Sequence, residues 1–129
     1  MTIKIGINGM GRIGRMVVRT IFENEFKDIK IKHINNRSSS EVSSNLLKYD
    51  SVHGQFKQKI TFNKNSLTIG KHKISFSQET NIDDINWSKH GVDYVLECTG
   101  KFNSKDKLYT HLKNGAKKVI VSAPCKNAD

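Results

Sequence analysis

The chain has 129 residues, 36% of them hydrophobic and 26% charged, with a formal net charge of +10. That length suffices for one domain with its own core, expected over residues 1–129, and no apolar run approaches the ~20 residues that a membrane-spanning helix needs. All but four of the 22 basic residues are lysine. They are dispersed along the chain, so we interpret them as a solvated surface and expect neither nucleic acid nor membrane as a partner.

Cysteine and histidine spacing argues against structural metal or disulfide chemistry. Cys98 and Cys125 are too few for a disulfide framework and form no C-x-x-C pair. None of the five histidines has His or Cys three or four positions later, so we expect no metal site. The N-terminus, MTIKIGING, has no signal-peptide pattern, which predicts a cytoplasmic location.

The first elements alternate between strand and helix patterns. The run IKIGIN, residues 3–8, predicts a strand that stops at Gly9. The next segment predicts a helix, because apolar residues recur along it at helical spacing. The members of that stripe are Ile13, Val17 and Ile21, widened by Met16 and Val18. A second strand is predicted at 29–35, and a helix at 40–48 that ends in Leu46 and Leu47.

The middle of the chain changes period. Residues 57–78 alternate apolar and polar side chains around the turn signals NKN and GK, which predicts an inserted antiparallel ribbon. A buried strand follows at 92–100, then a helix bounded by Ser104 and Gly115. The last strand, 117–124, stops at the single proline. Strands that alternate with helices form right-handed βαβ units. We therefore expect an α/β, Rossmann-type, doubly wound and mostly parallel sheet with an inserted antiparallel β-ribbon.

One motif carries the chemistry. The segment INGMGRIGR contains G-x-G-x-x-G as Gly9, Gly11 and Gly14, directly after a predicted strand and at the start of a predicted helix. The first glycine permits a tight turn, the second lets a pyrophosphate approach the backbone, and the third allows close packing of helix on strand. The amides of Arg12 and Ile13 would then point at the phosphates from the helix N-terminus. The alternative is a glycine-rich turn without a ligand.

Ligands of open α/β sheets bind outside the carboxyl ends of the strands. That rule selects Asn36 and Arg37 after the second strand. It also selects the small or polar residues after the two later strands, namely Thr99, Gly100, Lys101, Ser122 and Ala123. For Thr99 and Ser122, ordinary capping of a strand end is the alternative interpretation.

Asn36 stands where a dinucleotide site usually has a carboxylate that binds both ribose hydroxyls. The amide removes the negative charge that would repel a 2′-phosphate, and Arg37 adds a guanidinium suited to a phosphate. Ser38 and Ser39 add hydroxyl groups nearby. We therefore expect dual use of NAD and NADP, or a preference for NADP. The alternative is that Asn36 is a tolerated variant, Arg37 points to solvent and NAD is used.

Four segments in this order resemble the N-terminal cofactor domain of phosphorylating glyceraldehyde-3-phosphate dehydrogenases: KIGINGMGRIGR, LLKYDSVHGQF, ECTGKF and GAKKVIVSAP. The resemblance does not separate this family from erythrose-4-phosphate dehydrogenases. It implies that Arg12 and Ile13 meet the pyrophosphate and that Asn36 replaces the ribose-binding acid. It places Thr80 where the family often has an Arg near the adenine, Thr99 and Gly100 beside the adenosine, and Ser122 near the nicotinamide ribose. Met10 replaces a common Phe.

The resemblance also implies a reaction, an assembly and a missing part. The whole enzyme would oxidise glyceraldehyde 3-phosphate with phosphate and NAD(P) to 1,3-bisphosphoglycerate, in glycolysis or gluconeogenesis, as a homotetramer. The family's nucleophile belongs to a second domain after Asp129, so this chain would bind nucleotide without turnover. Cys125 matches a variable family position, and Cys98 is expected in the core. A non-catalytic nucleotide- or RNA-binding module is the rival, although an aromatic RNA-binding motif is missing.

Overall fold

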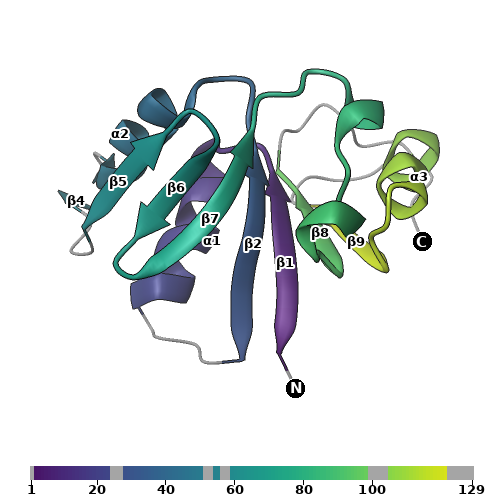
Figure 1. The fold of residues 1–129 in the computed structure, drawn as a ribbon, viewed down its shortest axis with the longest axis horizontal. Coiled ribbons are helices and arrows are strands. Elements are labelled where there is room, and N and C mark those ends of the chain that lie inside the picture. Colours follow the sequence, from purple (N-terminus) through teal and green to yellow (C-terminus); the bar gives the residue numbers. More distant parts are fainter. Residues whose placement is uncertain (1, 24–27, 51–53, 56–58, 99–104, 122–129) are drawn as a thin grey trace.

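A computed structural model describes residues 2–23, 28–50, 54–55, 59–98 and 105–121. Its centre is a seven-stranded sheet in the order β5-β6-β7-β2-β1-β8-β9 (Figure 1). The strands are β1 (Ile3–Asn8), β2 (Ile29–Asn35), β5 (Ile60–Asn63), β6 (Ser66–Ile69), β7 (His72–Ser77), β8 (Tyr94–Glu97) and β9 (Lys118–Val121). The short strands β3 (Tyr49–Asp50) and β4 (Gly54–Gln55) pair separately. The expected Rossmann-type α/β fold is confirmed.

The helices are α1 (Arg12–Glu23), α2 (Ser40–Lys48) and α3 (Lys105–Lys113), with 3-10 turns η1 (Ile82–Asp84) and η2 (Ser88–His90). In Figure 1, α1 and α2 lie behind the sheet, and the 3-10 turns lie in front of its β8–β9 end. Gly115 ends α3 as predicted: its φ is 116°, and the amide of Ala116 donates to the carbonyl of His111 at 3.0 Å. Within the described residues, no helix is long and apolar enough to cross a membrane.

The predicted ribbon exists but belongs to the main sheet. β5, β6 and β7 pair antiparallel, and β7 then pairs parallel with β2 through His33 and Ser75. The ribbon therefore extends the sheet rather than standing apart from it. The two later strands are shorter than predicted. β8 spans Tyr94–Glu97 and β9 spans Lys118–Val121. Residues 99–100 of the first predicted strand and 122–124 of the second lie outside the described residues.

One apolar cluster fills the space between the sheet and the helices α1 and α2. Ile5 and Ile7 point into it from alternate positions of β1, and Val18 and Leu47 meet them from the two helices. The predicted helix stripe is partly wrong. Val18 is fully buried and Val17 and Ile21 half-buried, whereas Ile13 and Met16 are exposed. The reason is that α1 packs on the sheet through Gly14 and Val18, which turns the side chains of Ile13 and Met16 outward. In α2, Leu47 is buried, whereas Leu46 is exposed.

A second cluster lies on the opposite face of the sheet, around Trp87. Trp87, Val92, Val95 and Ala116 are all buried there. The intervening position of β1 is Gly6, where a Cβ would lie 2.5 Å from a ring carbon of Trp87. A glycine in the middle of this strand therefore makes room for the indole.

An irregularity in β2 decides which polar residues reach that second face. Ile5 pairs with Ile31 but Gly6 pairs with His33, so Lys32 is an extra residue in β2. Beyond it, His33 and Asn35 occupy the same register positions as Gly6 and Asn8. Successive strand side chains point to opposite faces, so both pairs share the face that Trp87 covers.

Candidate nucleotide-binding site

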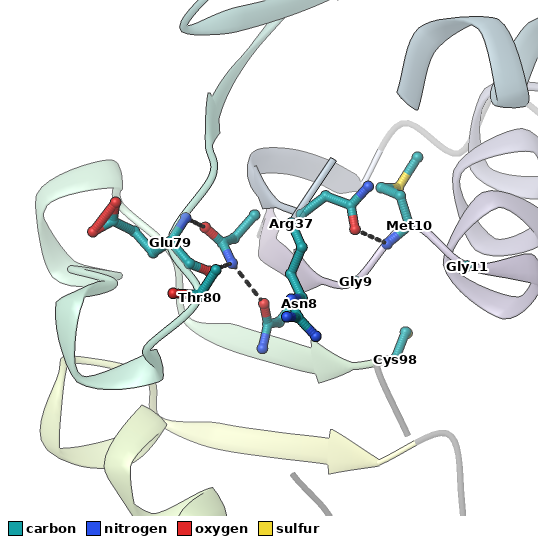
Figure 2. Close-up of a pocket in the computed structure, with 10 residues that line it drawn as sticks. Asn8, Gly9, Met10, Gly11, Arg37, Glu79, Thr80 and Cys98 are labelled. Carbon is teal, nitrogen blue, oxygen red and sulfur yellow. Dashed lines mark hydrogen bonds between the residues drawn. The ribbon is translucent and has the colours of Figure 1, made fainter. Parts of the chain in front are cut away.

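The carboxyl ends of β1, β2 and β8, together with the loop after β7, enclose a cavity of about 170 Å³ (Figure 2). This is the edge of the sheet where ligands of open α/β folds bind. The residues that line the cavity are Asn8, Gly9, Met10, Gly11, Asn35, Asn36, Arg37, Glu79, Thr80 and Cys98.

The fold requires glycine at two of the three positions of the motif. Gly9 has a φ of 102°, and its amide donates to the carbonyl of Asn35 at 2.8 Å, which anchors the turn to β2. A Cβ at Gly14 would lie 2.2 Å from the carbonyl oxygen of Gly9, so close packing of α1 on the turn demands glycine. A Cβ at Gly11 would meet no heavy atom of the described residues within 4 Å. Folding leaves that position open to whatever occupies the site.

The N-terminus of α1 completes this side of the site. Its first ladder bond runs from the amide of Arg15 to the carbonyl of Gly11 at 2.9 Å. The amides of Arg12, Ile13 and Gly14 precede it and have no acceptor within the helix ladder. The first turn contains no acidic residue. Positive helix-dipole charge and amide donors at this end favour an anion such as a pyrophosphate.

Asn36 connects the loop after β2 to the glycine turn. Its Oδ1 accepts a hydrogen bond from the amide of Met10 at 3.1 Å, and its Nδ2 donates to Ser43 Oγ in α2 at 2.9 Å. Because the amide of Met10 needs an acceptor, these bonds fix which end of the Asn36 side chain carries oxygen. The second hydrogen of Nδ2 has no acceptor among the described residues, and a carboxylate at this position would lack this donor.

Arg37 and Thr80 are both exposed and both line the cavity. In Figure 2 the Arg37 side chain runs from the end of β2 across the cavity instead of away from it. Ser39 has a structural role, because its Oγ accepts from the amide of Val42 at 3.2 Å and caps α2. Ser38 is exposed.

The structure brings five of the predicted site residues, Gly9, Gly11, Asn36, Arg37 and Thr80, to one cavity. Arg12, Ile13 and Gly14 form the adjoining start of α1, and only the backbone of Arg12 is described. Thr99, Gly100, Lys101, Ser122, Ala123 and Cys125 lie outside the described residues. Cys98 is half-buried: it packs against the first apolar cluster, as expected, but also lines the cavity.

Sequence reasoning missed the cavity residues Asn8, Asn35 and Glu79. The two asparagines are the last residues of β1 and β2, and both are buried. A polar residue that ends an otherwise apolar strand was the available signal. Among the described residues, no group of three or more His, Cys, Asp or Glu side chains could hold a metal ion.

Comparison with known proteins decides the family. The family model described as "Glyceraldehyde 3-phosphate dehydrogenase, NAD binding domain" matches residues 3–105. The chain belongs to this family. Proteins named glyceraldehyde-3-phosphate dehydrogenase are 45% identical to it in Cereibacter sphaeroides and 42% identical in Geobacillus stearothermophilus, each over 129 residues and 100% of this chain. The one from Ajellomyces capsulatus is 46% identical over 99% of this chain. The chain spans 38% of the length of each of these relatives, and it corresponds to the NAD-binding part of the family.

Proposed function

We propose that this chain binds NAD in the cavity at the strand ends and that it serves a phosphorylating glyceraldehyde-3-phosphate dehydrogenase. One observation carries the proposal: among the described residues, the backbone around Gly11 is open. It lies next to the first amides of α1, which have no acceptor within the helix ladder, and to the cavity at the strand ends. A pyrophosphate on those amides would direct the adenosine half of the dinucleotide toward Asn36, Arg37 and Thr80.

The reaction of the whole protein is part of the same proposal. The names of the relatives support oxidation of glyceraldehyde 3-phosphate with phosphate over oxidation of erythrose 4-phosphate. The described chain would contribute binding and orientation of the cofactor. A homotetramer, a role in glycolysis or gluconeogenesis and a cytoplasmic location stay predictions of the resemblance.

We also propose that the site accepts NADP. The support is chemical: Asn36 is neutral, one hydrogen of its Nδ2 has no acceptor in the described part of the chain, and Arg37 lines the same cavity. A 2′-phosphate there would meet donors instead of a repelling carboxylate.

Isothermal titration calorimetry of the chain tests the binding proposal, with NAD, NADP and AMP as separate titrants. We expect saturable binding of both dinucleotides and weaker binding of AMP, which lacks the pyrophosphate. If neither NAD nor NADP gives a binding signal, in a chain shown to be folded by circular dichroism, the binding proposal is overturned. Assay of the intact gene product with glyceraldehyde 3-phosphate and with erythrose 4-phosphate, each with phosphate present or omitted, tests the reaction.

A further inference from the structure

Four polar side chains form a row across neighbouring strands, on the face that Trp87 covers. Ser77 pairs with Asn35, Asn35 pairs with Asn8, and Asn8 pairs with Glu97 in the register of β7, β2, β1 and β8. Asn8, Asn35 and Glu97 are buried, with exposed fractions of 2%, 2% and 1%. Buried polar groups cost free energy unless their hydrogen bonds are made, so this row needs an internal partner for each group.

The row is hydrogen-bonded from end to end. Asn8 Nδ2 donates to Glu97 Oε1 at 2.7 Å, and Asn8 Oδ1 accepts from Asn35 Nδ2 at 2.9 Å. Asn35 Oδ1 in turn accepts from Ser77 Oγ at 2.6 Å. Because a carboxylate only accepts, Glu97 determines which end of the Asn8 amide faces it, and Asn8 then determines the orientation of Asn35.

Glu97 is held from the other side by His111 and Trp87, both fully buried. Trp87 Nε1 donates to His111 Nδ1 at 2.9 Å, and His111 Nε2 lies 2.8 Å from Glu97 Oε1. Since indole is only a donor, Nδ1 must be the bare nitrogen, and the ring hydrogen sits on Nε2. A neutral imidazole therefore donates to Glu97. Glu97 thus accepts hydrogen bonds from two sides, from Asn8 in the row and from His111, which itself accepts from Trp87.

The same row anchors the loops of the cavity. The carbonyl of Asn35 accepts from the amide of Gly9, and the carbonyl of Asn8 accepts from the amide of Cys98, both at 2.8 Å. The Asn35 side chain bonds the backbone of Glu79 twice, with Nδ2 donating to its carbonyl at 3.0 Å and Oδ1 accepting from its amide at 2.9 Å (Figure 2). A reversed Asn35 amide would place donor against donor at Glu79.

We propose that Glu97 and His111 are positioning residues for the cofactor site: they orient the Asn8–Asn35 pair, which fixes the loops after β1 and β7, and Cys98 at the end of β8, around the cavity. This inference rests on the proposed function, because the loops are those that would hold the dinucleotide. Neither Glu97 nor His111 lines the cavity, so the effect on the ligand would be indirect.

The test compares variants that keep or remove the acceptor at position 97. Glu97→Gln retains an oxygen that can accept from both Asn8 and His111, whereas Glu97→Leu retains none. Val95→Ala is the matched control, because Val95 is buried beside Trp87 in the same strand but takes no part in the polar row. Affinity for NAD is measured by calorimetry, and stability by urea denaturation, on all three variants and the unmodified chain.

We expect Glu97→Leu to lose at least about tenfold in affinity for NAD, the order of effect of unsatisfied buried polar groups. Glu97→Gln and Val95→Ala should stay within about threefold, even though Val95→Ala is destabilised. Equal affinity of Glu97→Leu and the unmodified chain would overturn the inference. So would an equal loss in Glu97→Gln, or an equal loss in the Val95→Ala control.

If Glu97→Leu does not fold, the positioning role is tested by NMR on the unmodified chain. Its nitrogen-15 NMR spectrum should show His111 as the neutral form with hydrogen on Nε2. The single indole N–H signal, which comes from Trp87, should shift when NAD is added. The other tautomer, or an indole signal indifferent to NAD, would overturn the inference. If the unmodified chain binds no NAD, the proposed function itself fails; if it binds but the variants bind equally well, only the positioning role fails.

Discussion

Asn36 Oδ1 lies 3.1 Å from the backbone nitrogen of Met10 and accepts its hydrogen bond. Two walls of the cavity, the glycine turn after β1 and the loop after β2, are thereby held together by the residue that replaces the expected acid. Its amide nitrogen is held by Ser43. Asn36 therefore makes the structural bond that a carboxylate could also make, but without a negative charge.

Cofactor preference should follow positions 36 and 37. Asn36→Asp combined with Arg37→Leu restores the repelling charge and removes the guanidinium. A charge-assisted hydrogen bond contributes about 1.5–3 kcal/mol, so the ratio of kcat/KM for NADP to that for NAD should fall at least about tenfold in the intact enzyme. An unchanged ratio would show that neither residue contacts the 2′ position. The single variants separate the loss of the guanidinium from the gain of the carboxylate.

Gly11→Val should abolish nucleotide binding without harming the fold. Among the described residues nothing lies within 4 Å of a Cβ at Gly11, so the new side chain would occupy only the space left for the pyrophosphate. Calorimetry should detect no binding of NAD, while the thermal unfolding curve stays close to that of the unmodified chain. Retained affinity would mean that the turn does not hold phosphate.

Gly6→Ala and Gly14→Ala should do the opposite and weaken the fold. The new Cβ would lie 2.5 Å from the Trp87 ring at Gly6, and 2.2 Å from the Gly9 carbonyl oxygen at Gly14. Overpacking of this kind costs about 1–3 kcal/mol in the free energy of unfolding. Urea denaturation measures the loss, with Gly11→Ala as the matched control, since its Cβ enters open space.

Stability should fall with acidity because of His33. Burial lowers the pKa of His33 from its ordinary 6.5 to about 3, with a further contribution from the charge of His90, whose ring stacks on it at 3.8 Å. Below pH 6.5 the unfolded chain gains a proton that the folded chain does not take up until about pH 3. The free energy of unfolding therefore falls as pH drops through this window, by about 2 kcal/mol between pH 7 and pH 5.

His33→Gln should remove that part of the pH dependence. Because carboxylates also titrate, the quantity to compare is the change in unfolding free energy from pH 7 to pH 5, for the variant against the unmodified chain. His72→Gln changes an exposed histidine and serves as control. The same pH dependence in His33→Gln would show that the buried imidazole is not its source.

Local patterns were sufficient to predict many of the elements from the sequence. β1 begins and ends where the sequence predicts it, because Ile3, Ile5 and Ile7 form one apolar face and Gly9 ends the strand. α2 also spans the predicted residues 40–48, although three of its four buried residues are serines. The glycine motif predicted the turn for the same reason: Gly9 and Gly14 are required by backbone geometry and close packing, both local effects.

The features that the sequence did not predict depend on pairing between strands that are far apart in the chain. The parallel contact of β7 with β2 and the extra residue Lys32 leave no local pattern, yet they determine which side chains share a face. The row from Ser77 to Glu97 depends on that register, so its members appeared as isolated polar residues in four separate strands. Ile13 and Met16 fitted a helix but not its buried face, which was set by the packing of Gly14 on Gly9.

The bonds around Asn8 also bear on how this molecule ages. Asn8 precedes Gly9, and an Asn–Gly step deamidates when the glycine nitrogen attacks the side-chain amide carbon to form a succinimide. In the fold, the amide of Gly9 donates to Asn35, and the Asn8 side chain is bound at both ends. Succinimide formation is therefore confined to molecules that have opened this region. An aspartate at position 8 would place a second negative charge against the Glu97 carboxylate. The fraction of deamidated molecules would therefore increase with the frequency at which the strand ends open.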